Sequence, residues 1–264
     1  MHRRATPMLV KRNPFARPRP GDEILPNVHL LGTHRVNFYA VTDGRSVTLV
    51  DCGFDGHRRY LQRWLDMSGR RLSDVEAIIL THGHADHVGF AERLRRQGIP
   101  VYLHDADTAF AMSPRGRRPP QRLRRGFWHA SALGLLGEAA LDGVFVQPVL
   151  KEVRRLSADS QLDVPGRPTV VAVPAHSAGS VAFRLPGQGA LLTGDTLMTR
   201  DPMFGGADRA VVFAEHTDRD HAALEALIHL RPLADDALLP AHGEPWTDAE
   251  AVGRAIRQAR IATA

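Results

Sequence analysis

The chain has 264 residues, of which 43% are hydrophobic and 24% are charged, a balance that supports a folded core and excludes a chain disordered throughout. Its single cysteine, Cys52, excludes an intrachain disulfide and favours a reducing compartment. The formal net charge is +5, and no apolar run approaches the length that spans a membrane, so we expect no membrane-embedded segment.

The positive charge is concentrated in two segments. Residues 1–20 and 114–125 each contain six Lys or Arg and no acidic residue, so the remainder of the chain is net negative. The first segment is rich in proline and lacks the apolar core of a secretory signal, which predicts a flexible basic arm and a cytoplasmic protein. We expect one folded domain over 21–264, with nucleic acid as an alternative partner of the basic segments.

The first part of this domain has the pattern of short strands and a helix. Apolar runs bounded by turn residues predict strands at 28–31, 37–41 and 47–50, and residues 72–80, which end in an apolar run at 77–80, lead into the next motif. Asp43 and Gly44 form a pair that is typical of a hairpin turn. An amphipathic helix is expected over 58–67, with Gly69 at the position of a C-terminal cap.

The next stretch, THGHADHVG at 81–89, is the most informative motif in the chain. It places four potential metal ligands within six residues: His82, His84, Asp86 and His87. Imidazole and carboxylate are preferred donors for a borderline metal such as Zn²⁺. They can converge only if the backbone turns sharply, and we expect Gly83 to permit that turn.

After this motif, a helix is expected from Asp86 to Arg96, followed by a strand at 101–104. Residues 106–160 form the least regular part of the pattern and predict an insertion, with a helical stretch from Asp107. The insertion would form either a lid over the site or a core helix. In the first case Phe127 and Trp128 would lie nearest to a substrate.

Three more potential ligands each follow an apolar run that predicts a buried strand, and these are His176, Asp195 and His242. Strand ends are rigid, so donors placed there can meet the tight distance tolerance of a metal site. Together with the first motif they are sufficient for two metal ions. Two helices are expected near the C-terminus, one beginning at Thr217 or Asp218 and one over 248–262.

These motifs and their order resemble the metallo-β-lactamase superfamily over about residues 23–247. The resemblance implies an αβ/βα four-layer sandwich, with two mixed β-sheets flanked by helices. It implies that one metal would be held by His82, His84 and His176, and the second by Asp86, His87 and His242. Asp195 would bridge the two metals. Asp51 matches an acidic residue that orients a ligand histidine without binding the metal itself.

Such a site implies hydrolysis by a metal-bridging hydroxide. We expect two divalent ions, with Zn²⁺ as the first choice and Fe, Mn or Co as alternatives. Asp86 and Asp195 are the candidate catalytic residues, because their carboxylates would orient the attacking water. A catalytically silent, metal-stabilised binding protein is the alternative from another class.

The substrate is expected to be a small ester, lactone or thioester. Few residues follow His242, whereas enzymes similar to glyoxalase II carry a long C-terminal domain. Many acyl-homoserine lactonases have a tyrosine three positions after the bridging aspartate, where this chain has Met198, a candidate pocket residue. A nucleic-acid phosphodiesterase or ribonuclease and a β-lactam hydrolase remain alternatives, and a homodimer is an open alternative to a monomer.

Overall fold

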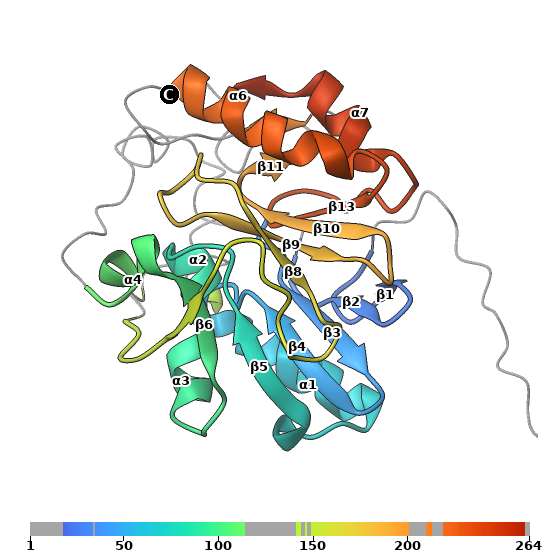
Figure 1. Cartoon of the computed structure of the whole chain (residues 1–264). Helices are drawn as coiled ribbons and strands as arrows, with labels where there is room; N and C mark the ends of the chain where they lie inside the picture. Colours follow the sequence, from blue (N-terminus) through green and yellow to red (C-terminus); the bar gives the residue numbers. More distant parts are fainter. Residues whose placement is uncertain are drawn as a thin grey trace, which may run out of the picture.

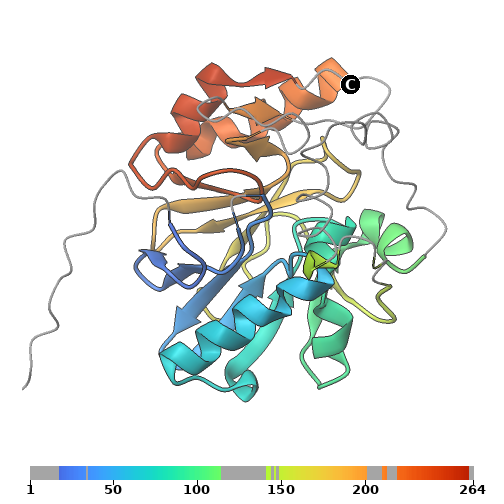
Figure 2. The same ribbon diagram turned by 180° about the vertical axis from the view of Figure 1, so that it is seen from behind.

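The computed structural model describes residues 18–33, 35–113, 141–143, 146, 149–200, 210–212 and 219–261. In this part of the chain two large β-sheets lie face to face (Figures 1 and 2). The first has seven strands in chain order: β1 (Glu23–Leu25), β2 (Val28–Leu30), β3 (Tyr39–Asp43), β4 (Ser46–Val50), β5 (Val75–Ile79), β6 (Val101–His104) and β7 (Arg154–Leu156). Neighbouring strands are antiparallel from β1 to β4 and parallel from β4 to β7.

The second large sheet has four strands in the spatial order β13-β10-β9-β8. Their bounds are β8 (Thr169–Ala172), β9 (Val181–Leu185), β10 (Ala190–Gly194) and β13 (Ala237–Pro240). A small third sheet contains β11 (Leu197–Met198), β12 (Val211–Val212) and β14 (Arg260–Ile261). Because β10 and β13 are parallel, as β4, β5 and β6 are, the loops that follow the strands of each group leave the same edge of their sheet.

Helices cover the outer faces of the two large sheets (Figure 1). The α-helices are α1 (Arg58–Ser68), α2 (Ala85–Val88), α3 (Ala91–Arg95), α4 (Asp105–Ala111), α6 (Arg219–Leu230) and α7 (Ala251–Gln258). Short 3₁₀ turns are η1 (Asp55–His57), η2 (Leu72–Asp74) and η5 (Arg231–Leu233). No helix in the described part of the chain is long and apolar enough to cross a membrane.

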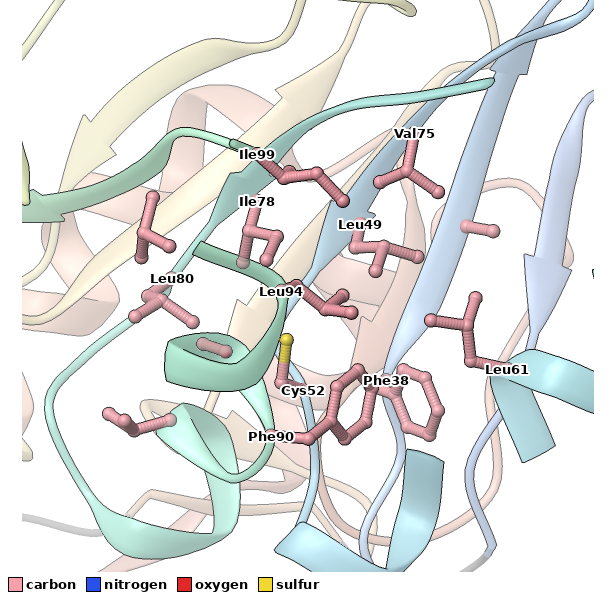
Figure 3. Packing of buried hydrophobic residues seen from close by; sticks show 14 of the residues in the cluster. Phe38, Leu49, Cys52, Leu61, Val75, Ile78, Leu80, Phe90, Leu94 and Ile99 are labelled. Atoms are coloured by element: carbon pink, nitrogen blue, oxygen red, sulfur yellow. The ribbon is translucent and has the colours of Figure 1, made fainter. Parts of the chain in front are cut away.

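Three apolar clusters hold these layers together. In the first, Leu61 of α1 and Leu94 of α3 pack against the first sheet around Leu49 and Ile78 (Figure 3). The second lies between the two large sheets and includes Phe183, and the third joins the second sheet to α6 and α7. Burying apolar area at each of these contacts is the main favourable term for folding. The order helix, sheet, sheet, helix confirms the predicted four-layer sandwich.

Several predicted elements are confirmed closely. The strand at 101–104 is β6, and the Asp43-Gly44 pair turns the β3–β4 hairpin, in which Asp43 pairs with Ser46. The helix over 58–67 is α1, and Gly69 caps it in the left-handed conformation with φ +64°. The hairpin and the capped helix depend on residues that are neighbours in the sequence, which explains why the sequence pattern alone predicts them.

Other expectations are wrong in their bounds. The helix expected from Asp86 to Arg96 is two short helices, because the chain breaks at Gly89, whose φ is +26°. A Cβ at this position would lie 1.8 Å from the carbonyl oxygen of Gly53, so the close backbone approach favours glycine and a kink. The helix expected over 248–262 is limited to α7, because the following residues pair with β12 as β14.

Candidate metal centre

The first group of donors contains His82, His84, His176 and Asp195, whose ligand atoms lie within 4.8 Å of one another. His82 follows β5, His176 follows β8 after a short turn, and Asp195 directly follows β10. Nδ1 of His84 lies 3.0 Å from Nε2 of His82 and 2.7 Å from Nε2 of His176. The three imidazoles therefore present ring nitrogens to one small volume, although the two loops are about ninety positions apart in sequence.

The second group contains Asp86, His87 and His242, which meet the same distance criterion. Both Asp86 and His87 lie on α2, while His242 follows β13. The Asp86 carboxylate lies 3.7 Å from Nε2 of His87 and 3.5 Å from Nε2 of His242. This group again combines residues from the loops of both large sheets.

The carboxylate of Asp195 lies between the two groups. Its Oδ1 is 3.2 Å from Nε2 of His87 and 3.2 Å from Nε2 of His242. Its Oδ2 faces the first group, at 3.4 Å from Nε2 of His176 and 3.8 Å from Nε2 of His82. Each oxygen thus faces a different group, which is the arrangement that a carboxylate bridging two cations requires.

A close approach between the two sheets makes this arrangement possible. Gly194, immediately before Asp195, has φ +54°, and a Cβ there would lie 2.7 Å from Oγ1 of Thr81. Only glycine combines this conformation with so little space. Val181 N also donates to the carbonyl oxygen of Thr81 at 2.9 Å. The loop of the first motif is therefore held directly against the second sheet.

The residues present fit a dinuclear metal centre. Among the described residues, Nε2 of His87 and Oδ1 of Asp195 are buried without a hydrogen-bond partner, although they lie 3.2 Å apart. A buried polar atom without a partner is unfavourable unless an ion or water satisfies it. Imidazole nitrogen and carboxylate oxygen together suit Zn²⁺, Fe²⁺ and similar cations. Two His/Asp groups joined by one carboxylate are consistent with two ions.

The electrostatics of the two groups differ. In the first group, burial and the neighbouring imidazoles hold the pKa of His82 well below its ordinary value of 6.5. The pKa of His176 is also lowered, because burial outweighs the attraction of Asp195. These rings are therefore neutral, which is the form whose lone pair can bind a metal.

In the second group, negative charge dominates. Burial alone would lower the pKa of His242, but the carboxylates of Asp195 and Asp86 outweigh it and raise the pKa to about 9. The same competition raises the pKa of His87 well above 6.5, with Asp195, Asp51 and Asp86 as the charges that favour its cation. This field favours a positive charge in the second group, whether that charge is a proton or a metal ion.

Asp51 lies in direct contact with one of these histidines. Its Oδ2 lies 2.9 Å from Nδ1 of His87, which leaves Nε2 of that ring directed at the centre. The two oxygens of Asp51 also accept hydrogen bonds from the backbone N–H and the hydroxyl of Thr81, at 2.8 and 2.9 Å. Thr81 was not singled out from the sequence, although it begins the first motif.

Asn37 and Tyr39 hold the loop that carries His242, and sequence reasoning missed both. The Asn37 amide donates to the carbonyl oxygens of Pro240 and Gly243 at 2.9 and 2.7 Å, and the Tyr39 hydroxyl donates to Pro240 at 2.6 Å. A buried Asn at 37, inside an otherwise apolar run, was the available signal, because such a group needs partners. Nδ1 of His242 contacts the carbonyl oxygen of Arg35.

The structure brings all seven predicted ligands together. It describes only one of the three predicted pocket residues. Met198 lies on β11 with its side chain only 1% exposed, and its contact with a substrate stays a prediction. Phe127 and Trp128 lie outside the described residues, as does most of the expected insertion at 106–160. Gly83 has a different use from the one expected, since it is absent from the positions with positive φ and instead packs closely against α4.

Comparisons with known proteins agree with this geometry. The pattern of the Metallo-beta-lactamase superfamily matches residues 31–242. The chain is 25% identical over 238 residues to the Bacillus subtilis protein "Probable metallo-hydrolase YflN", covering 86% of this chain and 88% of that protein. It is 30% identical to "Uncharacterized protein ML0493" of Mycobacterium leprae, covering 82% and 90% of the two chains.

Solved structures show the same relationship. A metallo-beta-lactamase family protein of Thermus thermophilus superimposes with a TM-score of 0.62 and 26% identity, over 89% of this chain and 78% of that one. The crystal structure of TTHA1623 in a di-iron-bound form superimposes with a TM-score of 0.58 and 26% identity, over 88% of this chain and 98% of that one. The superfamily pattern spans most of the sequence, and a solved structure of that family superimposes on most of the chain. The chain therefore belongs to the metallo-beta-lactamase superfamily.

Proposed function

We propose that this protein is a metal-dependent hydrolase that uses a dinuclear centre to cleave a small ester, lactone or thioester. The observation that carries the proposal is the position of Asp195, whose two carboxylate oxygens face two separate groups of histidines. In this proposal His82, His84 and His176 hold one ion, and Asp86, His87 and His242 hold the second, with Asp195 shared. The relative named as a metallo-hydrolase supports hydrolysis but does not identify a substrate.

Two bound divalent cations would supply Lewis acidity, which makes water a nucleophile near neutral pH and polarises a carbonyl group. We take Zn²⁺ as the native metal, and the di-iron form of the related TTHA1623 makes iron the first alternative. No further nucleophile is needed from the protein. Acyl transfer to water is therefore the simplest chemistry for this donor set.

The residues differ in their access to a substrate. His82, His87, His176, Asp195 and His242 are buried, each no more than 7% exposed. The Asp86 side chain is 23% exposed, and His84 is also partly exposed. We propose that a substrate approaches from the side of Asp86 and His84, and that Asp86 orients the attacking water and accepts its proton.

The test is metal content by elemental analysis together with a panel of ester, lactone, thioester, β-lactam and phosphodiester substrates. We expect about two metal equivalents per chain and turnover of an ester, lactone or thioester. His242→Ala should retain about one equivalent and lose activity by at least about 100-fold, because the second ion loses a ligand.

His221→Ala is the matched control, since His221 lies on α6 with its side chain 67% exposed and should keep both metals and full activity. A His242→Ala variant with two metals and full activity would overturn the assignment of His242. Two metals with turnover of phosphodiesters alone would overturn the substrate class and favour nucleic-acid processing.

A further inference from the structure

We propose that Asp107 on α4 is a positioning residue that holds the two loops of the first metal group in register. This inference rests on the proposed dinuclear centre and concerns a residue that lies outside its ligand set. Asp107 is only 3% exposed, although aspartate is seldom buried without specific partners.

Its carboxylate joins loops that come from different sheets. Oδ2 accepts hydrogen bonds from the backbone N–H of Gly83 at 2.8 Å and from the hydroxyl of Ser177 at 2.7 Å. Oδ1 accepts from the backbone N–H of Gly179 at 2.8 Å. Gly83 lies between the ligands His82 and His84, and Ser177 follows the ligand His176. One side chain thus connects the backbone beside all three imidazoles of the first group.

Close packing reinforces these bonds. A Cβ on Gly179 would lie 2.7 Å from both the backbone nitrogen and the carboxylate of Asp107, and a Cβ on Gly83 would lie 3.2 Å from the Asp107 carbonyl oxygen. The His84 ring also packs edge-on against Phe110 of α4, with ring centroids 5.2 Å apart. Both glycines therefore allow the loops to approach α4, and the helix forms one wall of the first group.

A role in the helix itself does not account for Asp107. The N-terminus of α4 is capped by His104, whose ring accepts from the backbone N–H of Ala106 at 3.3 Å. The Asp107 carboxylate makes its three described hydrogen bonds outside this helix. Three convergent donors match an ionised carboxylate, which only accepts, and they match no other side chain of this size.

The second metal group has separate supports. His87 is held by Asp51, and the loop of His242 is held by Asn37 and Tyr39. None of these contacts passes through Asp107. Loss of the Asp107 carboxylate should therefore weaken metal binding in the first group and leave the second group largely unchanged.

Asp107→Asn tests this with minimal change in shape. The amide of Asn has one acceptor oxygen, so its NH₂ group must face at least one of the N–H donors of Gly83 and Gly179. Zn²⁺ affinity is measured by chelator competition on the full chain in two backgrounds. His242→Ala leaves the first group intact, and His176→Ala leaves the second. We expect Asp107→Asn to lower Zn²⁺ affinity by about 10- to 100-fold in the His242→Ala background and by less than about twofold in the His176→Ala background.

Asp105→Asn is the matched control, because it removes the same charge from α4, where Asp105 faces solvent beside Arg155 with its side chain 52% exposed. It should change affinity less than about twofold in both backgrounds. Ser177→Ala provides a second variant if Asp107→Asn folds poorly, and it should weaken the first group alone by a smaller factor. The absorption spectrum of the Co²⁺ form should change with Asp107→Asn in the His242→Ala background only.

Unchanged affinity in the His242→Ala background, or an equal loss in both backgrounds, would overturn the positioning role. Equal losses would mean that Asp107 supports the fold in general. If the unmodified chain binds no metal, the proposed function fails; if it binds two ions and Asp107→Asn binds them equally well, only this inference fails.

Discussion

At the residue scale, the central feature is the unequal charge around the two groups of histidines. Three carboxylates, Asp51, Asp86 and Asp195, favour a cation at His87, whereas burial lowers the pKa of His82 and His176 in the first group. A proton and a metal ion compete for the same nitrogen lone pair. The two halves of the centre should therefore respond differently to pH.

We predict that Zn²⁺ binding by the second group strengthens as pH rises. The pKa of His242 is raised to about 9, so the metal-free ring carries a proton at pH 7 that must leave before an ion binds. In the His176→Ala background, affinity should increase by at least about tenfold per pH unit between pH 7 and 9, since His242 releases one proton and His87, whose pKa is also raised, contributes to the release. Chelator competition at a series of pH values measures this, and a flat profile would contradict it.

The same pKa shift of His242 also determines how the stability of the metal-free protein changes with pH. A folded-state pKa raised above 6.5 means that the His242–carboxylate attraction is fully present below about pH 6.5 and is lost as pH rises through about 9. In the first group His82 and His176 have lowered pKa values, so its Zn²⁺ affinity should change little over the same range. The His242→Ala background provides that comparison.

The seven donors could be predicted from sequence because four lie in one motif and three follow apolar runs. Apart from Asp51, which the family resemblance indicated, the supporting residues could not be predicted in this way. Asp107 contacts Ser177 across 70 positions, and Asn37 contacts Gly243 across 206. The apolar run after Asn37 indicates that this amide is buried but not which groups it contacts, and Asp107 has no local pattern that distinguishes it from a solvated carboxylate, so only the fold reveals their partners.

At the element scale, the break between α2 and α3 shows a position where packing against another segment overrides the helical pattern of the sequence. The periodic sequence after Asp86 favours one helix, but the contact of Gly89 with the backbone at Gly53 requires a kink. That kink places α2, with Asp86 and His87, at the centre while α3 packs Leu94 into the core. A continuous helix could not satisfy both requirements with this geometry.

We predict that Gly89→Ala destabilises the protein by about 2–4 kcal/mol, because its Cβ would meet a backbone atom that cannot move independently. Gly69→Ala is the comparison, since Gly69 also has a positive φ but lies in the left-handed region, with φ +64° and ψ +25°, and has nothing within 4 Å of its Cβ position. It should cost only about 1 kcal/mol. Urea denaturation measures the loss of unfolding free energy in both variants, and equal losses would contradict the prediction.

At the scale of the whole molecule, the four layers could be predicted from the strand and helix patterns together with the superfamily resemblance. The short third sheet could not be predicted, because β11, β12 and β14 each have only two residues and pair through contacts distant in sequence. The centre lies where the loops of the two large sheets meet. His82 follows a strand of the first sheet, whereas Asp195 and His242 follow strands of the second.

Because the ligands come from both sheets, metal binding should stabilise the packing of the sandwich as well as the loops. A ligand that binds only the folded state at about 100 times its Kd stabilises it by about 2.7 kcal/mol, which corresponds to a rise in Tm of about 5–10 °C for a chain of this size. We therefore predict that chelation lowers the Tm by this amount. The double variant His176→Ala/His242→Ala, which lacks one ligand in each group, should show little change on chelation. If the unmodified chain has the same Tm with and without metal, the ions do not link the two sheets, and the loops must be preformed by contacts such as those of Asp51 and Asp107 alone.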